Sequence, residues 1–218
     1  EYFRDAEFRF YITVWFLACM TLTLNVWGDT YSSFAKSMRA AFFQGTSILT
    51  TTGFVTEDFD LWPQTSRVML VIMMFIGGCA GSTGGGVKNV RVLTCLKGLF
   101  REMFLYMKPD AVKTVRIGGT PVKNETVRNI VAFLLIFIFL FAAGTLAMTA
   151  FTPDLETAMS SSIACLGNIG PGLSGVGATQ NYAAIPDAGK SVLVLLMLLG
   201  RLELYTVLVV FVPGFWRR

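Results

Sequence analysis

Long apolar stretches alternate with short polar segments along this chain. Three stretches carry no charged residue, and each approaches or exceeds the roughly 20 residues that a helix needs to cross a bilayer. They cover residues 10–28, 68–87 and 129–151, and a fourth apolar run over 191–216 is interrupted only by Arg201 and Glu203. Because a buried helix of a soluble protein rarely stays uncharged for so long, the pattern predicts four membrane spans.

Two shorter amphipathic segments, residues 34–49 and 155–166, lie between these spans. They are too short to cross a membrane as helices and too apolar for ordinary loops, so we expect re-entrant half-helices. Each ends in a polar, glycine-bearing sequence: TSILTTTGF over 46–54 and SSIACLGNIGPG over 161–172. Backbone that leaves a helix at membrane depth is tolerated where it is buried in protein or lines a watery path. The two breaks therefore favour a pore.

The order of these elements repeats along the chain. Residues 7–105 and 126–215 each contain a span, a short amphipathic segment, a break, an outer loop and a second span. Aligning the breaks sets residues 50–54 against 167–171 and pairs Gly53 with Gly170, although two unrelated hairpins that both contain glycine would look similar. Internal repeats are common in transport proteins.

We therefore predict an all-α membrane protein built from two membrane–pore-loop–membrane repeats, with re-entrant half-helices and extended filter segments. The first repeat would cover residues 1–105, with a pore helix at 34–49, a filter at 50–55 and a span broken by a glycine-rich loop at 77–86. A basic linker at 106–125 would follow. The last repeat would cover 126–218, with a pore helix at 155–166 and a filter at 167–172.

Composition and charge agree with a membrane location. The chain is 54% hydrophobic and only 15% charged, whereas soluble domains are about a quarter charged. Basic residues gather between the second and third spans and at both ends, which is the positive-inside pattern. It predicts a multi-pass protein with both termini and the middle loop in the cytoplasm. The basic residues of the middle loop are Lys88, Arg91, Lys97, Arg101, Lys108, Lys113, Arg116, Lys123 and Arg128.

Several function classes have little support. The basic loop lacks a recognisable nucleic-acid-binding motif, so we expect no nucleic-acid partner. The chain has no histidine, and its four cysteines are widely spaced, which disfavours a zinc site or a disulfide framework. An enzyme in the membrane would need buried acids, histidine or an activated nucleophile, and Glu203 is the one intramembrane carboxylate expected. We predict neither enzymatic activity nor a bound cofactor.

The residue types at the breaks suit a dehydrated cation. Such an ion exchanges its water oxygens for backbone carbonyls that point inward. Glycine permits the unusual backbone angles that this requires, and a half-helix that ends at the site turns its partly negative end toward the ion. The candidate ion-binding residues are Thr51, Thr52, Gly53, Phe54, Asn168, Ile169 and Gly170.

A second glycine cluster, GGCAGSTGGG over residues 77–86, lies at the end of the second span. So many glycines would break a membrane helix. Close helix packing through small residues is one interpretation, and phosphate binding is another. Gly81 and Gly86 have the spacing of a phosphate-binding loop, but Val87 stands where lysine is required. We favour a flexible intramembrane loop beneath the filter, able to obstruct the pore.

Arg201 lies within the last predicted span. A charge at that depth is costly and normally faces a cavity or a partner. Glu203 is two residues away and does not share a helix face with Arg201, so the carbonyl groups of the glycine-rich loop are the candidate partners. The alternative is that both side chains lie near the cytoplasmic end and extend to the membrane surface.

Four motifs together resemble the TrkH/KtrB/HKT superfamily of potassium transporters, and its TrkH branch most closely. They are TTTGF at 50–54, GGCAGSTGGGVKNVR at 77–91, GNIGPG at 167–172 and GRLEL at 200–204. The resemblance implies four such repeats around one central pore, of which this chain would supply the last two. It also implies one filter glycine for each repeat, here Gly53 and Gly170.

The resemblance carries further expectations about ions, gating and partners. Potassium is the expected substrate, bound at Thr52, Gly53, Ile169 and Gly170, and it would diffuse passively down its electrochemical gradient. The expected setting is the lipid of a bacterial inner membrane, with a homodimer and a cytoplasmic ring of nucleotide-binding regulatory subunits of the TrkA type. The expected gating residues are Gly78, Gly81, Ser82, Thr83, Gly84, Gly85, Gly86 and Arg201.

Two of four repeats cannot enclose an ion by themselves. The chain opens at Glu1 without a methionine, so we expect it to be a piece of a longer protein. A non-conducting structural or regulatory membrane subunit is the alternative function.

Overall fold

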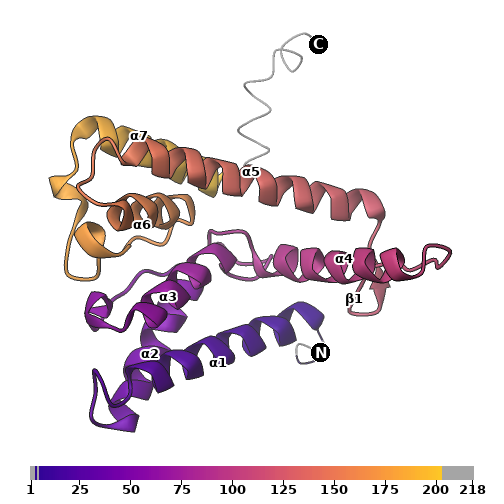
Figure 1. Ribbon diagram of the computed structural model, residues 1–218, viewed down its shortest axis with the longest axis horizontal. Helices are drawn as coiled ribbons and strands as arrows, with labels where there is room; N and C mark the ends of the chain where they lie inside the picture. Colours follow the sequence, from indigo (N-terminus) through magenta and orange to yellow (C-terminus); the bar gives the residue numbers. More distant parts are fainter. Residues whose placement is uncertain (1–2, 4, 203–218) are drawn as a thin grey trace.

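The computed structural model describes Phe3 and residues 5–202. The described part is almost entirely helical, and the helices run roughly along one direction in two adjoining groups (Figure 1). The helices are α1 (Ala6–Val26), α2 (Phe34–Leu49), α3 (Gln64–Ile76), α4 (Asn89–Met107), α5 (Asn124–Met148), α6 (Leu155–Leu166) and α7 (Asp187–Arg201), with the short strands β1 (Arg116–Ile117) and β2 (Thr120–Pro121) between α4 and α5.

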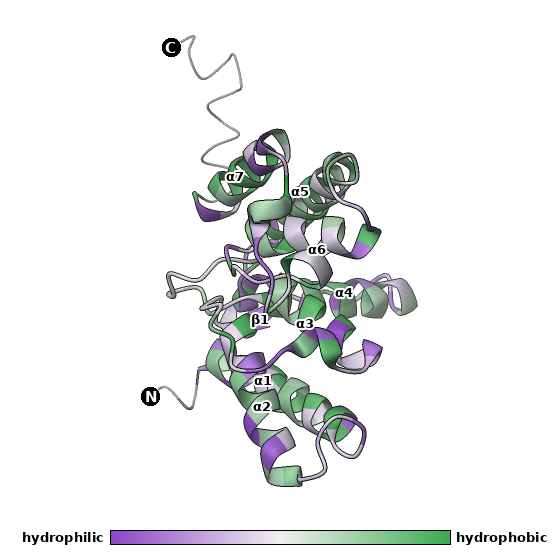
Figure 2. Ribbon diagram, turned by 90° about the vertical axis from the view of Figure 1, so that its left-hand side faces the viewer, coloured by the Kyte–Doolittle hydropathy of each residue, from purple (hydrophilic) through white to green (hydrophobic). Residues whose placement is uncertain are grey.

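Among the described residues, α1 and α5 are the two helices long and apolar enough to cross a membrane. Helix α1 begins before the first predicted span and α5 before the third. The predicted spans began after the last charged residue, whereas a helix begins at its N-cap. Asp5 caps α1 by accepting a hydrogen bond from the Phe8 N–H, at 2.8 Å. After its polar first turns α5 is almost entirely apolar, and its ribbon is mostly green in Figure 2, which is typical of a helix surrounded by protein and lipid.

The second predicted span, residues 68–87, was wrong in extent. Helix α3 begins at Gln64 and ends at Ile76, and the chain becomes helical again only at Asn89. The interruption falls on the glycine-rich run, where Gly77 has φ +71° and Gly86 has φ +76°, angles that favour glycine. The break predicted at 77–86 is therefore present, and it divides the span into two helices.

The fourth predicted span begins with α7, whose N-cap is Pro186. The helix ends at Arg201, and the rest of the predicted run, including Glu203, lies outside the described residues.

The two predicted pore-helix ranges are helical with the expected bounds. Helix α2 packs on α1 and α3, and α6 packs on α5 and α7, so each short helix is held by the long helices of its own repeat. Helix α6 is buried along nearly its whole length, and Figure 2 shows it below α5 and α7. Contacts between α3 and α6 join the two repeats.

The predicted linker at 106–125 contains the one β-sheet within the described range. Strands β1 and β2 form an antiparallel hairpin in which Arg116 pairs with Pro121 and Ile117 with Thr120. Gly118 and Gly119 have φ +56° and +87° at its turn, the combination that a tight two-residue hairpin favours. Helix α4 extends to Met107 and α5 starts at Asn124, so the linker is shorter than predicted.

Candidate ion filter and glycine-rich loop

The end of α2 has the hydrogen bonds of a Schellman cap. The N–H of Thr51 donates to the Ile48 carbonyl at 3.1 Å, and the N–H of Thr52 donates to the Ser47 carbonyl at 2.9 Å. Thr51 itself is in the left-handed region, with φ +57°. This cap satisfies the last carbonyls of the helix and turns the chain sharply out of it.

The end of α6 repeats this geometry at every matching position. The N–H of Asn168 donates to Cys165 at 3.0 Å, and the N–H of Ile169 donates to Ala164 at 2.9 Å. Asn168 has φ +52°. The capping residues before it also agree, with φ −78° and ψ −3° at Thr50 and φ −79° and ψ −7° at Gly167. The two breaks have the same backbone conformation even though their sequences hardly match. This favours a true repeat over two unrelated hairpins.

The two breaks meet in space. Gly53 has φ +77°, and a Cβ built on it would overlap the carbonyl oxygen of Ile169 and lie 3.1 Å from Cδ of Pro171. Its partner in the alignment, Gly170, has φ +114°. Because residues 53 and 169 are far apart in sequence, this approach brings the ends of α2 and α6 to one place.

The side chains around the breaks differ between the repeats. Phe54 is 71% exposed, whereas Ile169 is 4% exposed and packs into the core. Thr52 and Gly170 are exposed to solvent in this chain. The carbonyl oxygen of Gly170 accepts a hydrogen bond from the Tyr182 hydroxyl at 2.7 Å. Sequence reading did not identify Tyr182, which comes from the outer loop twelve residues later.

The glycine-rich loop lies directly against both breaks. A Cβ on Gly84 would stand 2.9 Å from Oγ1 of Thr51, and a Cβ on Gly85 would overlap the Gly167 carbonyl oxygen and approach Cβ of Asn168 at 3.3 Å. Side chains at these positions would push the loop away. The loop is not helical and follows a helix instead of a strand, so neither helix packing through small residues nor a phosphate-binding loop describes it.

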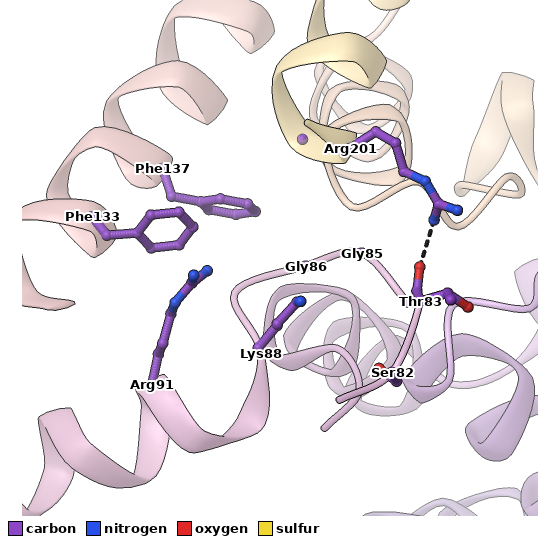
Figure 3. A pocket seen from close by; sticks show the side chains of 11 residues that line it. Ser82, Thr83, Gly85, Gly86, Lys88, Arg91, Phe133, Phe137 and Arg201 are labelled. Atoms are coloured by element: carbon purple, nitrogen blue, oxygen red, sulfur yellow. Dashed lines mark hydrogen bonds between the residues drawn. The ribbon is translucent and has the colours of Figure 1, made fainter. Parts of the chain in front are cut away.

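Arg201 binds this loop. Its Nη1 donates a hydrogen bond to the Thr83 carbonyl oxygen (Figure 3). The prediction that Arg201 finds its partner among the carbonyls of the glycine-rich loop is thus confirmed. Two other predicted loop residues contact each other: Ser82 donates from Oγ to the Cys79 carbonyl at 2.7 Å, and a Cβ on Gly78 would meet the Ser82 hydroxyl. Gly81 has open space around its Cβ position.

A cavity of about 280 Å³ opens between the loop, α5 and the end of α7. Figure 3 shows Lys88 and Arg91 entering it from the start of α4, opposite Phe133 and Phe137 of α5. The Arg91 guanidinium lies 4.1 Å from the centroid of the Phe133 ring, a cation–π distance. In the sequence analysis, Lys88 and Arg91 served only to predict the orientation of the chain in the membrane. Their position just after the glycine-rich run could also have indicated that they lie near the loop. The full lining is Ser82, Thr83, Gly84, Gly85, Gly86, Lys88, Arg91, Phe133, Phe137, Gly200 and Arg201.

The outer loops of the two repeats are joined by a charged cluster. Arg67 of α3 binds Glu156 of α6, and Asp60 accepts a hydrogen bond from the Ser174 N–H at 2.9 Å. Burial raises the pKa of Asp60, against the opposing effects of the Ser174 N–H and Arg67. Because Ser174 has φ +56°, Asp60 supports a backbone conformation that a serine rarely adopts.

We expect Asp60→Ala to destabilise the protein by about 1 kcal/mol, because the partly buried Ser174 N–H loses its acceptor. Thermal unfolding in detergent, followed by tryptophan fluorescence, would measure the lowered midpoint. Asp29→Ala is the matched control, because Asp29 is an exposed carboxylate. Equal midpoints for the two variants would contradict this role of Asp60.

Comparisons with known proteins show the family of this chain. The family model TrkH, described as a cation transport protein, matches residues 2–217. The Trk system potassium uptake protein TrkH of Escherichia coli K12 is 39% identical over 99% of this chain, and TrkG of the same organism is 32% identical over 98%. The crystal structure of the potassium transporter TrkH from Vibrio parahaemolyticus superposes with a TM-score of 0.91 at 36% identity, over 99% of this chain.

The chain spans a little under half the length of these relatives, 44% of either E. coli protein and 46% of the Vibrio chain. The structural match confirms the predicted fold class, a helical membrane protein. The relatives are transporters, which confirms the prediction that the chain is not an enzyme. The four motifs, the paired backbone breaks and the match over almost every residue lead to one conclusion: the chain belongs to the TrkH family of cation transport proteins.

Proposed function

We propose that this chain forms two of four repeats of a subunit that conducts potassium across the membrane. The observation that carries the proposal is the matched break at the ends of α2 and α6, where Gly53 meets residues 169–171. Relatives that are named potassium uptake proteins support the choice of ion. The chain covers under half of those relatives, which supports a ring completed by two further repeats.

In the proposed filter, the main-chain carbonyls of Thr52, Gly53, Ile169 and Gly170 replace the water of a potassium ion. Thr51, Phe54 and Asn168 complete this part of the filter. The ends of α2 and α6 reach the same point, and their partly negative C-termini would favour a cation there. No covalent step is needed, so ions move down their electrochemical gradient.

The glycine-rich loop is the proposed gate. It lies against the starts of both breaks, and the bond from Arg201 to Thr83 holds it there. In this position residues 78–86 would obstruct the path of an ion leaving the filter. Displacing the loop requires that bond to break, and glycine supplies the backbone freedom for the movement.

The proposed setting is a bacterial inner membrane, with the chain ends and the basic linker in the cytoplasm. The start of α1, the end of α4, the hairpin and the start of α5 lie at one end of the molecule, which is where the basic residues gather (Figure 1). This arrangement supports the positive-inside orientation. A homodimer and a cytoplasmic ring of TrkA-type nucleotide-binding subunits remain proposals drawn from the family resemblance, and the name "Trk system" is consistent with several components.

Rubidium flux into liposomes tests the function. We expect the complete protein, reconstituted without other components, to take up radioactive rubidium. External potassium should inhibit this uptake at concentrations about tenfold or more below those of sodium, corresponding to roughly 1.4 kcal/mol of preference. Flux equal to that of protein-free liposomes would instead support a non-conducting structural or regulatory subunit.

A further inference from the structure

The first residue of each break after the helix cap is in the left-handed conformation. In the second break this residue is Asn168, a residue type that adopts this conformation comparatively often. In the first break it is Thr51, whose β-branched side chain makes φ +57° unusual. A conformation of this kind persists only where its surroundings hold it in place, so the contacts of Thr51 matter.

The side chain of Thr51 contacts the glycine-rich loop. Its Oγ1 accepts a hydrogen bond from the Gly85 N–H at 3.1 Å, across 34 residues of sequence. The backbone N–H of Thr51 is already used in the helix cap, so the hydroxyl is the group that connects this break to the loop. No side chain separates them, because Gly84 and Gly85 lie too close to the breaks to carry one.

The second break has a corresponding connection. Nδ2 of Asn168 donates to the Met197 carbonyl oxygen of α7 at 3.1 Å. Met197 lies one helical turn before Arg201, and Arg201 binds the Thr83 carbonyl of the loop. The left-handed residue of each break therefore contacts the inner element of its own repeat, and the Arg201–Thr83 bond joins those two inner elements.

We infer that Thr51 couples ion binding in the filter to the position of the glycine-rich loop. This inference rests on the proposed function and assigns Thr51 a positioning role within it. With the loop in place, the Gly85 N–H holds Thr51 in the conformation that sets the peptide planes of Thr52 and Gly53. When the loop moves away, that restraint is lost and the filter binds potassium less tightly, which helps the ion to leave.

Coupling of this kind is reciprocal. If the loop in place strengthens potassium binding, then potassium in the filter must favour the loop in place by the same factor. Potassium should therefore protect the loop from reagents. Cys79 is a native reporter, since it lies in the loop and is partly exposed. Cys95 of α4 is also partly exposed but lies outside the loop, and Cys19 and Cys165 are buried.

The experiment measures the rate at which a maleimide modifies Cys79 in the complete protein, read by mass spectrometry of the peptide that contains it. Rates are compared in potassium and in an equal concentration of N-methylglucamine. For the unchanged protein we expect potassium to slow the modification about fivefold or more, within the usual range of coupling between sites. In Thr51→Val, which keeps the shape but loses the hydroxyl, the two rates should be equal and fast.

Three variants separate the hydroxyl from other effects. Thr51→Ser keeps the hydroxyl and should restore protection by potassium. Thr51→Gly removes both the hydroxyl and the backbone strain, so it should behave like Thr51→Val even if the valine variant folds poorly. Thr21→Val is the control, because the Thr21 hydroxyl bonds only within α1, to the Leu17 carbonyl, and should leave protection intact.

Protection of Cys79 by potassium in Thr51→Val or Thr51→Gly would overturn the inference, as would an unprotected wild-type protein. These outcomes leave the rubidium flux assay unaffected, so failure of the coupling and failure of the proposed transport function are distinguishable.

Discussion

Gly53→Ala should lose most of its preference for potassium over sodium. At φ +77° an alanine is strained by about 1–2 kcal/mol, and its Cβ would also overlap the Ile169 carbonyl oxygen. Relief of that overlap must move backbone in both breaks, because neither contact involves a flexible side chain. Two proposed ion-binding carbonyls would then leave their positions together.

We expect the potassium-to-sodium ratio of flux to fall about tenfold or more, since each 1.4 kcal/mol of lost preference is a factor of ten. Reconstituted protein and competition between rubidium and sodium would measure it. Gly28→Ala is a matched control, because Gly28 has a similar φ of +95° but open space around its Cβ position. Gly28→Ala therefore has similar backbone strain, but its Cβ does not overlap another group. A Gly53→Ala protein with unchanged ion preference would remove Gly53 from the filter.

Arg201→Gln should increase flux in the absence of any activating partner. The wild-type guanidinium donates to the Thr83 carbonyl and fixes the loop beside both breaks. Charge-assisted hydrogen bonds contribute about 1.5–3 kcal/mol, so losing this one should raise the open population by roughly one to two powers of ten. Removing a positive charge beside a cation pathway acts in the same direction.

Rubidium uptake by reconstituted Arg201→Gln protein would measure this effect. Lys97→Gln is the control, because Lys97 is a cation that bonds near the hairpin, to the Arg116 carbonyl, away from both breaks. Its flux should equal that of the wild type. If Arg201→Gln folds normally and its flux is unchanged or lower, the proposed gate is wrong.

The short helices α2 and α6 were predictable because local chemistry fixes the C-terminal end of each and the start of α6. Asp154 caps α6 by accepting a bond from the Thr157 N–H at 2.7 Å, and each helix stops where its own last turn closes into a Schellman cap. These bonds span only three to five residues. The extents of α3 and α4 were harder to predict, because an apolar, uncharged run has the same pattern whether it stays helical or forms an apolar loop.

The location of the site was predictable in part. The glycines indicated where the chain leaves the helix, and the cost of a buried charge indicated that Arg201 needs a carbonyl partner. Tyr182, Arg91 and Phe133 were not identified as site residues. Tyr182 contacts Gly170, and Arg91 and Phe133 contact each other and line the cavity. A local sequence pattern does not predict such contacts.

The amino-acid order by itself determined the class of the protein, its two repeats and the residues at which each pore helix ends, because these follow from apolar length, charge placement and hydrogen bonds between near neighbours. The tertiary structure alone decided that Gly53 meets Ile169, that Gly85 reaches Thr51 and that Asp60 binds Ser174. These pairs are separated by 34 to 116 residues, and packing of α3 against α6 brings the two repeats together. Residues so far apart in sequence come into contact only when whole helices pack against each other. The proposed filter and gate depend on these contacts.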